Sequence, residues 1–411
     1  MNDIIGAVVW VCVSIIGCII YIKLVVLSCI QYLLPSSHTV IKNVADCMTA
    51  IVSEYGFREE TADISGVSVH CVIKDADAAT DAATDATDVS APDVIVFIHG
   101  TASSSLIFFD VMKNLPRNQK CVAIDLPNFG ISGRIDLDKY PTNQELCACY
   151  SDIIGHTLQT LGIVEHTVLV AHSLGGFLSI YVADRFPIKK LVLLNPAGIL
   201  PTLGEYGYYW GMFFKAGLPS SLFHLPLVSR ELLAYMWRSC APTTTTTTTE
   251  FWISLFANPD NDGHRVLQRL ITIYPFYSYW NTPAFTTLTD VYKKVPMTIC
   301  FGVNDTIIPS HIGGFIHEVS RGEIIIHNIQ NANHNPCENI ERILEILGSV
   351  NNDIECGYVK TPRHRHRRRC DELCRGYSYH SLQKTQDSFE SIYDYLLKHT
   401  TYCPPHSASL P

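Results

Sequence analysis

Ser173 lies in a segment that favours nucleophilic chemistry. Residues Val168–Gly176 read V-L-V-A-H-S-L-G-G, so an apolar run that predicts a buried strand leads into the serine and then into a helix-like stretch. A sharp strand-to-helix turn projects a serine hydroxyl clear of the backbone, but it crowds the positions two before and two after the serine. Small residues, Ala171 and Gly175, occupy these two positions. The segment therefore predicts a nucleophile, with a chance serine in an ordinary turn as the alternative.

A serine nucleophile needs a general base, and the base needs a carboxylate that orients it. Asp305 follows the apolar run Met297–Phe301. His334 follows a second such run, Glu323–Ile329. Both residues lie at the predicted C-terminal ends of strands, where the sites of parallel sheets are found. We therefore expect Ser173, Asp305 and His334 to form one catalytic triad.

Two other residues compete for the roles of base and acid. His327 is a second candidate base, but it lies inside a predicted strand, where a packed side chain is the simpler interpretation. Asp290 is a second candidate acid, but it lies in a helix-like stretch. The position directly after the run Leu191–Leu194 is Asn195, which excludes an acid there.

The elements that would position these residues alternate between short buried strands and helices, which predicts an α/β fold with a mostly parallel sheet and helices on both faces. The expected strands are Val94–Ile98, Val122–Ile124, Val168–Ala171, Leu191–Leu194, Met297–Phe301 and Glu323–Ile329. The expected helices are Thr142–Leu161, Leu174–Arg185, Ile312–Ser320 and Pro336–Leu347.

The chain resembles the α/β-hydrolase superfamily, in particular its serine lipase-like and esterase-like members. The resemblance covers roughly residues 92–349 and rests on the segments FIHGTASS, DLPNFGISG, VAHSLGG and FGVNDTIIP, followed by NANHNP, in that order. One departure is that Ala171 stands where the family usually has the first glycine of its nucleophile turn. Alanine is small enough for the same crowded site.

The resemblance implies an oxyanion hole made by the backbone N–H groups of Thr101 and Leu174. It also implies an acyl-enzyme mechanism in which Ala171 and Gly175 shape the nucleophile turn, and it requires no metal and no other cofactor. We expect His99 to be a structural histidine of the loop after its strand, and Asp125 to be architectural rather than a catalytic acid.

The composition limits the class of protein. The chain has 411 residues, of which 47% are hydrophobic and 17% are charged, which excludes a wholly disordered protein. The net charge of −9 does not favour nucleic-acid binding.

Residues Ile4–Ile22 contain no charged side chain, and as a helix they would span about 28 Å, close to the apolar thickness of a bilayer. We expect a single-pass membrane anchor here, with a cleaved signal peptide or a buried helix as alternatives.

The expected organisation has six parts. These are an anchor at 1–34, a strand pair with an acidic low-complexity loop at 35–91, the first part of the core at 92–197, an inserted cap at 198–282, the second part of the core at 283–349, and a basic, disordered tail at 350–411. The aromatic cap is expected over the site, with a packed subdomain that binds nothing as the alternative. Lys23 and Lys42 follow the uncharged run Ile4–Ile22, and no Lys or Arg precedes it, so we expect the body to be cytosolic.

These features predict a membrane-associated serine hydrolase that cleaves a small carboxylic ester, lipid-like and of the monoacylglycerol or lysophospholipid type. One alternative is an acyltransferase on lysophospholipid. Some membrane-associated relatives of that kind have an aspartate five residues after the histidine, where this chain has Asn339. A non-catalytic scaffold at the membrane is the other alternative, and the oligomeric state stays open.

Overall fold

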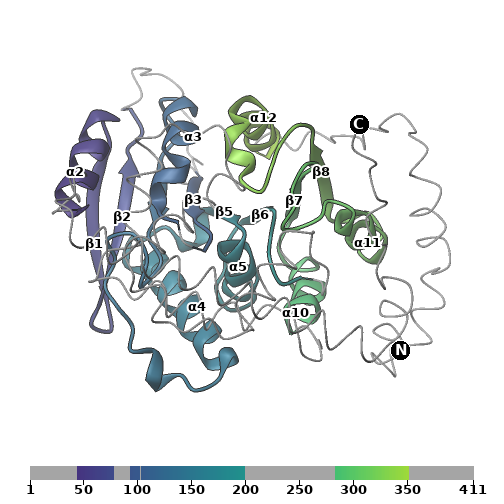
Figure 1. The fold of residues 1–411 in the computed structure, drawn as a ribbon, viewed down its shortest axis with the longest axis horizontal. Coiled ribbons are helices and arrows are strands. Elements are labelled where there is room, and N and C mark those ends of the chain that lie inside the picture. The colour runs from purple at the N-terminus through teal and green to yellow at the C-terminus, as the bar shows by residue number, and fades with distance from the viewer. Residues whose placement is uncertain (1–43, 78–92, 102, 200–282, 351–411) are drawn as a thin grey trace, which may run out of the picture.

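A computed structural model describes residues 44–77, 93–101, 103–199 and 283–350 of the chain (Figure 1). These residues form one sheet of eight strands in the order β1-β2-β4-β3-β5-β6-β7-β8. The strands are β1 (Arg58–Ile64), β2 (Val67–Lys74), β3 (Val94–Ile98), β4 (Cys121–Ile124), β5 (Thr167–His172), β6 (Lys190–Leu194), β7 (Met297–Gly302) and β8 (Ile325–Ile329). β2 pairs antiparallel with β1 and with β4, and all other pairs are parallel. The predicted, mostly parallel sheet is therefore confirmed.

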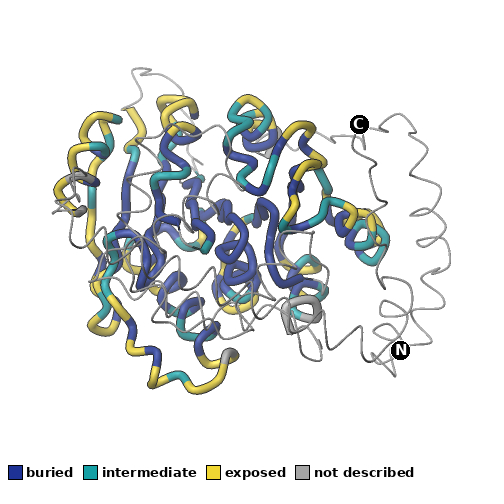
Figure 2. The backbone as a smooth tube through the Cα atoms, viewed as in Figure 1, coloured by how far each residue is buried: buried dark blue, intermediate teal, exposed yellow. Residues whose placement is uncertain are grey.

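The central strands are buried on both faces, which explains why their sequences are continuous apolar runs. Every residue of β3, β4, β5 and β7 is buried, and Figure 2 shows this buried centre in dark blue. Alternate residues of β5 belong to different hydrophobic clusters, with Leu169 and Ala171 on one face and Val168 and Val170 on the other. The two clusters are the two halves of the core, one on each side of the sheet.

Helices cover both faces. Side chains of α4 (Asn143–Thr160), α5 (Leu174–Arg185), α10 (Pro283–Val291) and α11 (Ile312–Val319) pack into the first cluster. Side chains of α2 (Val44–Glu54), α3 (Phe109–Asn114) and α12 (Ile340–Val350) pack into the second. In Figure 1, α3 and α12 lie on the opposite side of the central strands from α4 and α5. The start of α4 has a clear local cause, because Thr142 and Glu145 form a capping box.

One predicted helix was wrong at its start. The expected helix Pro336–Leu347 is a 3₁₀ turn, Pro336–Glu338, followed by α12 from Ile340. The side chain of Asn335 accepts a hydrogen bond from the N–H of Cys337 and starts the short turn, and Asn339 then leaves helical geometry at φ −96° and ψ 67°. The strand predicted over Glu323–Ile329 begins at Ile325.

Several expectations lie outside the described residues. They are the anchor at 1–34, most of the acidic loop, the cap from residue 200 to residue 282, and the tail from residue 351. Within the described ranges, none of the helices combines the length and the apolar character needed to cross a membrane. The expected strand pair is present as β1 and β2. Six described cysteines, Cys71, Cys121, Cys147, Cys149, Cys300 and Cys337, are free thiols.

Candidate active site

Ser173 lies on the turn between β5 and α5. Its backbone has φ 51° and ψ −114°, outside the conformations that most residues prefer. Three hydrogen bonds fix this conformation: the N–H of Ser173 donates to the carbonyl of Leu194 at 2.9 Å, and the carbonyl of Ser173 accepts from the N–H groups of Phe177 and Ala197, each at 3.1 Å. The chain therefore holds the serine in a strained turn at the C-terminal end of the sheet.

Glycines allow this turn to pack closely against the end of β3. A Cβ atom at Gly175 would lie 2.5 Å from the carbonyl oxygen of His99 and 2.6 Å from that of Ile98. A Cβ atom at Gly100 would lie 2.9 Å from the Cβ of Ser173. Ala171 is fully buried in β5 and pairs with Ile98. Gly175, which the sequence pattern singled out, therefore lies where there is no room for a larger residue.

Ser173, His334 and Asp305 lie in one line of contacts. Nε2 of His334 is 3.0 Å from Oγ of Ser173, and Nδ1 of His334 is 2.8 Å from Oδ2 of Asp305. Because an ionised carboxylate can only accept, Nδ1 is assigned the proton, and the lone pair of Nε2 then faces the serine hydroxyl. All three residues are buried, with 7 to 8% of their surface exposed. The arrangement can move a proton from the serine to the imidazole.

The carboxylate of Asp305 is fixed on its other side by the backbone. Its Oδ1 accepts hydrogen bonds from the N–H groups of Ile307 at 2.7 Å and Ile308 at 2.9 Å. Oδ2 is thereby turned toward the imidazole of His334. Asp305 lies in the loop after β7, which ends at Gly302, and His334 lies in the loop after β8, so two neighbouring parallel strands bring the acid and the base together.

The competing residues lie elsewhere. Asp290 is exposed on α10, where its carboxylate lies 3.5 Å from Nζ of Lys293. His327 is part of β8 and pairs with Cys300. Burial, and secondarily the charge of Arg342, lower the pKa of His327. In the part of the chain that is described, neither residue forms a hydrogen bond or ion pair with Ser173, His334 or Asp305.

The loop after β3 contains Thr101, whose peptide is oriented by His99. The ring of His99 accepts a hydrogen bond from the N–H of Leu126 at Nε2 (2.9 Å), so Nδ1 is assigned the proton and donates to the carbonyl of Gly100 at 2.7 Å. That carbonyl belongs to the same peptide unit as the N–H of Thr101. Leu174 is the first residue of α5, where backbone N–H groups have no partner within the helix. Both expected oxyanion donors thus lie on segments adjacent to Ser173.

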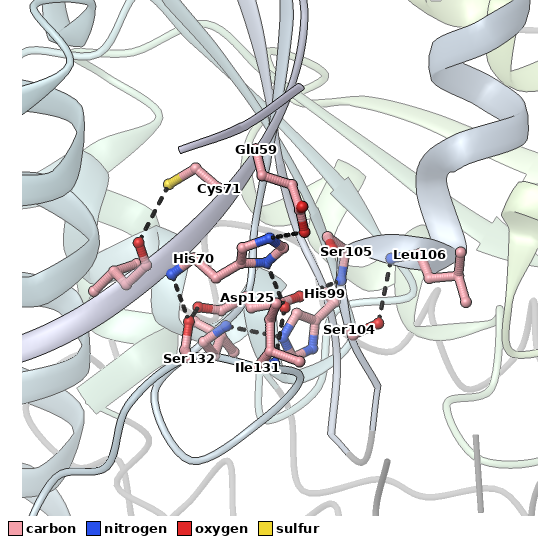
Figure 3. Close-up of polar contacts among 12 residues, drawn as sticks. Glu59, His70, Cys71, His99, Ser104, Ser105, Leu106, Asp125, Ile131 and Ser132 are labelled. Carbon is pink, nitrogen blue, oxygen red and sulfur yellow. Dashed lines mark hydrogen bonds and ion pairs between the residues drawn. The ribbon is translucent and has the colours of Figure 1, made fainter. Parts of the chain in front are cut away.

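Asp125 is architectural, and Figure 3 shows its contacts. Its fully buried carboxylate accepts from the N–H of Ser105 at 2.6 Å, from the N–H of Ile131 at 3.1 Å and from Nδ1 of His70 at 2.9 Å. Nε2 of His70 is in turn 3.0 Å from a carboxylate oxygen of Glu59. This network joins the loop after β3 and the loop after β4 to the edge strand β1 and its neighbour β2.

Two residues whose role was not predicted from the sequence form hydrogen bonds to the backbone of His334. The side chain of Asn195 donates to the carbonyl oxygens of Asn333 at 3.0 Å and His334 at 2.7 Å, and Nε2 of His172 donates to the same carbonyl of His334 at 2.8 Å. The only available signal was position, because His172 precedes the nucleophile and Asn195 directly follows β6.

Comparison with known proteins gives one family match. The family described as "Alpha/beta hydrolase family" matches residues 95–345. An uncharacterized hydrolase, YugF of Bacillus subtilis, is 35% identical over 132 residues, which are 30% of this chain and 46% of that protein. Monoacylglycerol lipase abhd6-A of Xenopus laevis is 26% identical over 142 residues, 34% of this chain and 41% of that protein. The chain spans just under half the length of the curated relatives it matches first.

Solved structures agree on the fold. A bacterial membrane phospholipase A superposes with a TM-score of 0.57 at 15% identity, covering 82% of this chain and 98% of that one. The Cif epoxide hydrolase of Acinetobacter nosocomialis superposes with a TM-score of 0.54 at 17% identity, covering 77% of this chain and 98% of that one. At such identities the likeness concerns the fold alone.

Proposed function

Because the chain belongs to the alpha/beta hydrolase family, we propose that it is a serine hydrolase that cleaves carboxylic esters with Ser173, His334 and Asp305. The observation that supports this proposal best is the continuous contact from the serine hydroxyl through the imidazole to the carboxylate, at 3.0 Å and 2.8 Å. Relatives named as hydrolases, an esterase and a lipase support the same reaction class.

In the first half of the proposed reaction, Nε2 of His334 takes the proton of Ser173 while Oγ attacks the ester carbonyl carbon. Asp305 stabilises the imidazolium ion that forms. The N–H groups of Thr101 and Leu174 bind the oxyanion of the tetrahedral intermediate. When this intermediate collapses, the ester C–O bond breaks, the alcohol leaves with the proton from His334, and an acyl group stays on Ser173.

In the second half, His334 takes a proton from water while the water oxygen attacks the acyl carbon. The bond to Oγ of Ser173 then breaks, and His334 returns its proton to the serine. The products are a carboxylic acid and the free enzyme. A serine at position 173 separates this chemistry from that of an epoxide hydrolase, which needs a carboxylate nucleophile.

We further propose that the substrate is lipid-like, of the monoacylglycerol or lysophospholipid type, and that the chain acts at a membrane with its catalytic body in the cytosol. Two observations support this. One curated relative is named a monoacylglycerol lipase, and residues Ile4–Ile22 form a long uncharged apolar run. Fractionation of cells that express the full chain or a chain lacking residues 1–34 tests the location, since only the full chain should sediment with membranes.

The activity is tested with a fluorophosphonate probe and a panel of esters. The purified full chain should be labelled, and it should hydrolyse monoacylglycerols or lysophospholipids faster than short soluble esters. The variant Ser173→Ala should lose both labelling and hydrolysis, whereas Ser179→Ala, which removes a buried hydroxyl without a hydrogen-bond partner in the described residues, should keep both. Labelling that persists in Ser173→Ala would remove Ser173 from the mechanism. Transfer of the acyl group to a lysophospholipid in preference to water would replace hydrolysis with acyl transfer.

A further inference from the structure

The carbonyl oxygen of His334 accepts hydrogen bonds from two buried side chains. Nε2 of His172 donates to it at 2.8 Å, and Nδ2 of Asn195 donates to it at 2.7 Å. Asn195 uses the rest of its amide on the same loops: Nδ2 also donates to the carbonyl of Asn333 at 3.0 Å, and Oδ1 accepts from the N–H of Gly302 at 2.7 Å. The backbone of His334 is thus tied to residues at the ends of β5, β6 and β7.

The hydrogen bond from His172 to His334 leaves the other ring nitrogen of His172 without a partner, and this indicates a specific role for the histidine. A carbonyl oxygen can only accept, so Nε2 is assigned the proton and Nδ1 is left as an acceptor. Nδ1 is buried without a hydrogen-bond partner in the described residues. It packs against Gly100, where an added Cβ would lie 2.9 Å from it. Because a buried acceptor without a partner costs free energy, a histidine at this position is unfavourable unless the hydrogen bond of its Nε2 is needed.

Asn195 is held in an uncommon backbone conformation, with φ 43°. Asparagine adopts the left-handed region more readily than most residues. Asn195 is fully buried, and its own N–H donates to the carbonyl of Cys300 in β7 at 2.8 Å. Its backbone and side chain therefore bind neighbouring elements together at the point where the loop of His334 passes.

The neutral state of His172 supports a role as a hydrogen-bond donor and not as a proton-transfer group. Burial, and secondarily the neighbouring His334, lower the pKa of His172 to about 3. The two rings lie 5.0 Å apart between centroids. His172 therefore stays neutral when His334 takes a proton, and its Nε2 donor remains in place.

We infer that His172 and Asn195 are positioning residues that hold the backbone of His334 so that its imidazole faces the hydroxyl of Ser173. This inference rests on the proposed function. His172 directly precedes Ser173, so one side chain joins the nucleophile's strand to the loop of the base. A small displacement of a catalytic group lowers the rate strongly, because reaction needs the two groups near contact distance.

A matched pair of variants at position 172 tests the inference. In His172→Gln the side-chain amide nitrogen reaches the place of Nε2, and in His172→Asn it reaches only the place of Nδ1. We expect His172→Asn to lower kcat about tenfold with KM within about twofold of wild type, and His172→Gln to restore most of the loss. Wild-type kcat in His172→Asn, or equal losses in both variants, would overturn the inference.

Two further measurements keep this test separate from the test of the proposed function. Hydrogen exchange of residues 331–337 should be faster in His172→Asn than in wild type and near wild type in His172→Gln, whatever the activity of the protein. Equal exchange in all three proteins would contradict the inference. If His172→Asn does not fold, Asn195→Gly removes the second donor while it tolerates the positive φ, and it should show the same faster exchange. Absence of fluorophosphonate labelling in the wild type, in contrast, would contradict the proposed function alone.

Discussion

Nδ1 of His70 lies 2.9 Å from the buried carboxylate of Asp125, and this ion pair joins β2 to the loop after β4. Burial lowers the pKa of His70, but the hydrogen bonds and charges of Asp125 and Glu59 outweigh burial, so the pKa is raised overall. Burial raises the pKa of Asp125, but the hydrogen bond and charge of His70, together with the backbone hydrogen bond from Ser105, outweigh it, so this pKa is lowered overall. The protein therefore gains stability from a charged His70 beside a charged Asp125.

The pH dependence of unfolding tests this pair. A raised pKa gives stability that is complete below the unfolded value of about 6.5 and is lost as pH rises through the folded value. The lowered pKa of Asp125 gives stability that is present above about 3.9 and is lost as pH falls through its folded value. We expect His70→Gln to be less stable than wild type by about 3 kcal/mol at pH 6, with a smaller difference at pH 9. Chemical unfolding at both pH values measures this, and an equal difference at both would contradict a charged His70.

His99 should affect the oxyanion hole and not substrate binding. The variant His99→Phe keeps a ring but removes the hydrogen bond to the carbonyl of Gly100, so the peptide of Thr101 loses its orientation. We expect kcat for a p-nitrophenyl ester to fall about 10- to 100-fold with little change in KM. His156→Phe, on the exposed surface of α4, is the control and should leave both constants unchanged. A change in KM with an unchanged kcat would contradict this role.

Gly175 should not tolerate even one added methyl group. In Gly175→Ala the new Cβ would meet two backbone carbonyl oxygens at 2.5 and 2.6 Å, neither of which can move freely. We expect a loss of about 1–3 kcal/mol of unfolding free energy and much slower fluorophosphonate labelling. Gly314→Ala is the matched control, since nothing lies within 4 Å of its added Cβ in α11, and it should be as stable as wild type or more so. Equal unfolding free energies and equal labelling rates for the two variants would contradict the close packing at Gly175.

Asp305 should act through the tautomer of His334. Asp305→Asn keeps the shape of the side chain, and its amide oxygen can still accept from Ile307 and Ile308, but the amide nitrogen would face Nδ1. The wrong tautomer of His334 would then be favoured. We expect kcat to fall about 10³- to 10⁴-fold, with the free energy of unfolding nearly unchanged. Steady-state kinetics with a p-nitrophenyl ester measures this effect. Activity within tenfold of wild type would mean that another acid orients the base.

Strands and site residues could be predicted from the sequence wherever a local pattern of residues determines the structure. Apolar runs such as Val94–Ile98 predicted central strands because both faces of those strands are buried. The positions of Asp305 and His334 followed from the ends of such runs, since parallel strands end at one edge of the sheet. These two side chains do lie in contact.

The remaining features depend on contacts between distant segments. His172 and His334 are 162 residues apart, and nothing in either local sequence indicates that the ring of one reaches the carbonyl of the other. The same holds for His70 and Asp125, which meet only because β2 pairs with β4. The start of α12 was missed because the side chain of Asn335 caps a short turn first, a local choice that the helical spacing of apolar residues does not reveal.

Intact-protein and peptide mass spectrometry after rapid mixing with a p-nitrophenyl ester shows whether Ser173 carries the acyl group. We expect the protein to gain the mass of one acyl group within the burst of p-nitrophenol release, on the peptide that contains Ser173, and we expect Ser173→Ala to show neither adduct nor burst. Turnover of the ester with the acyl group on another residue, or with undiminished rate in Ser173→Ala, would contradict this expectation.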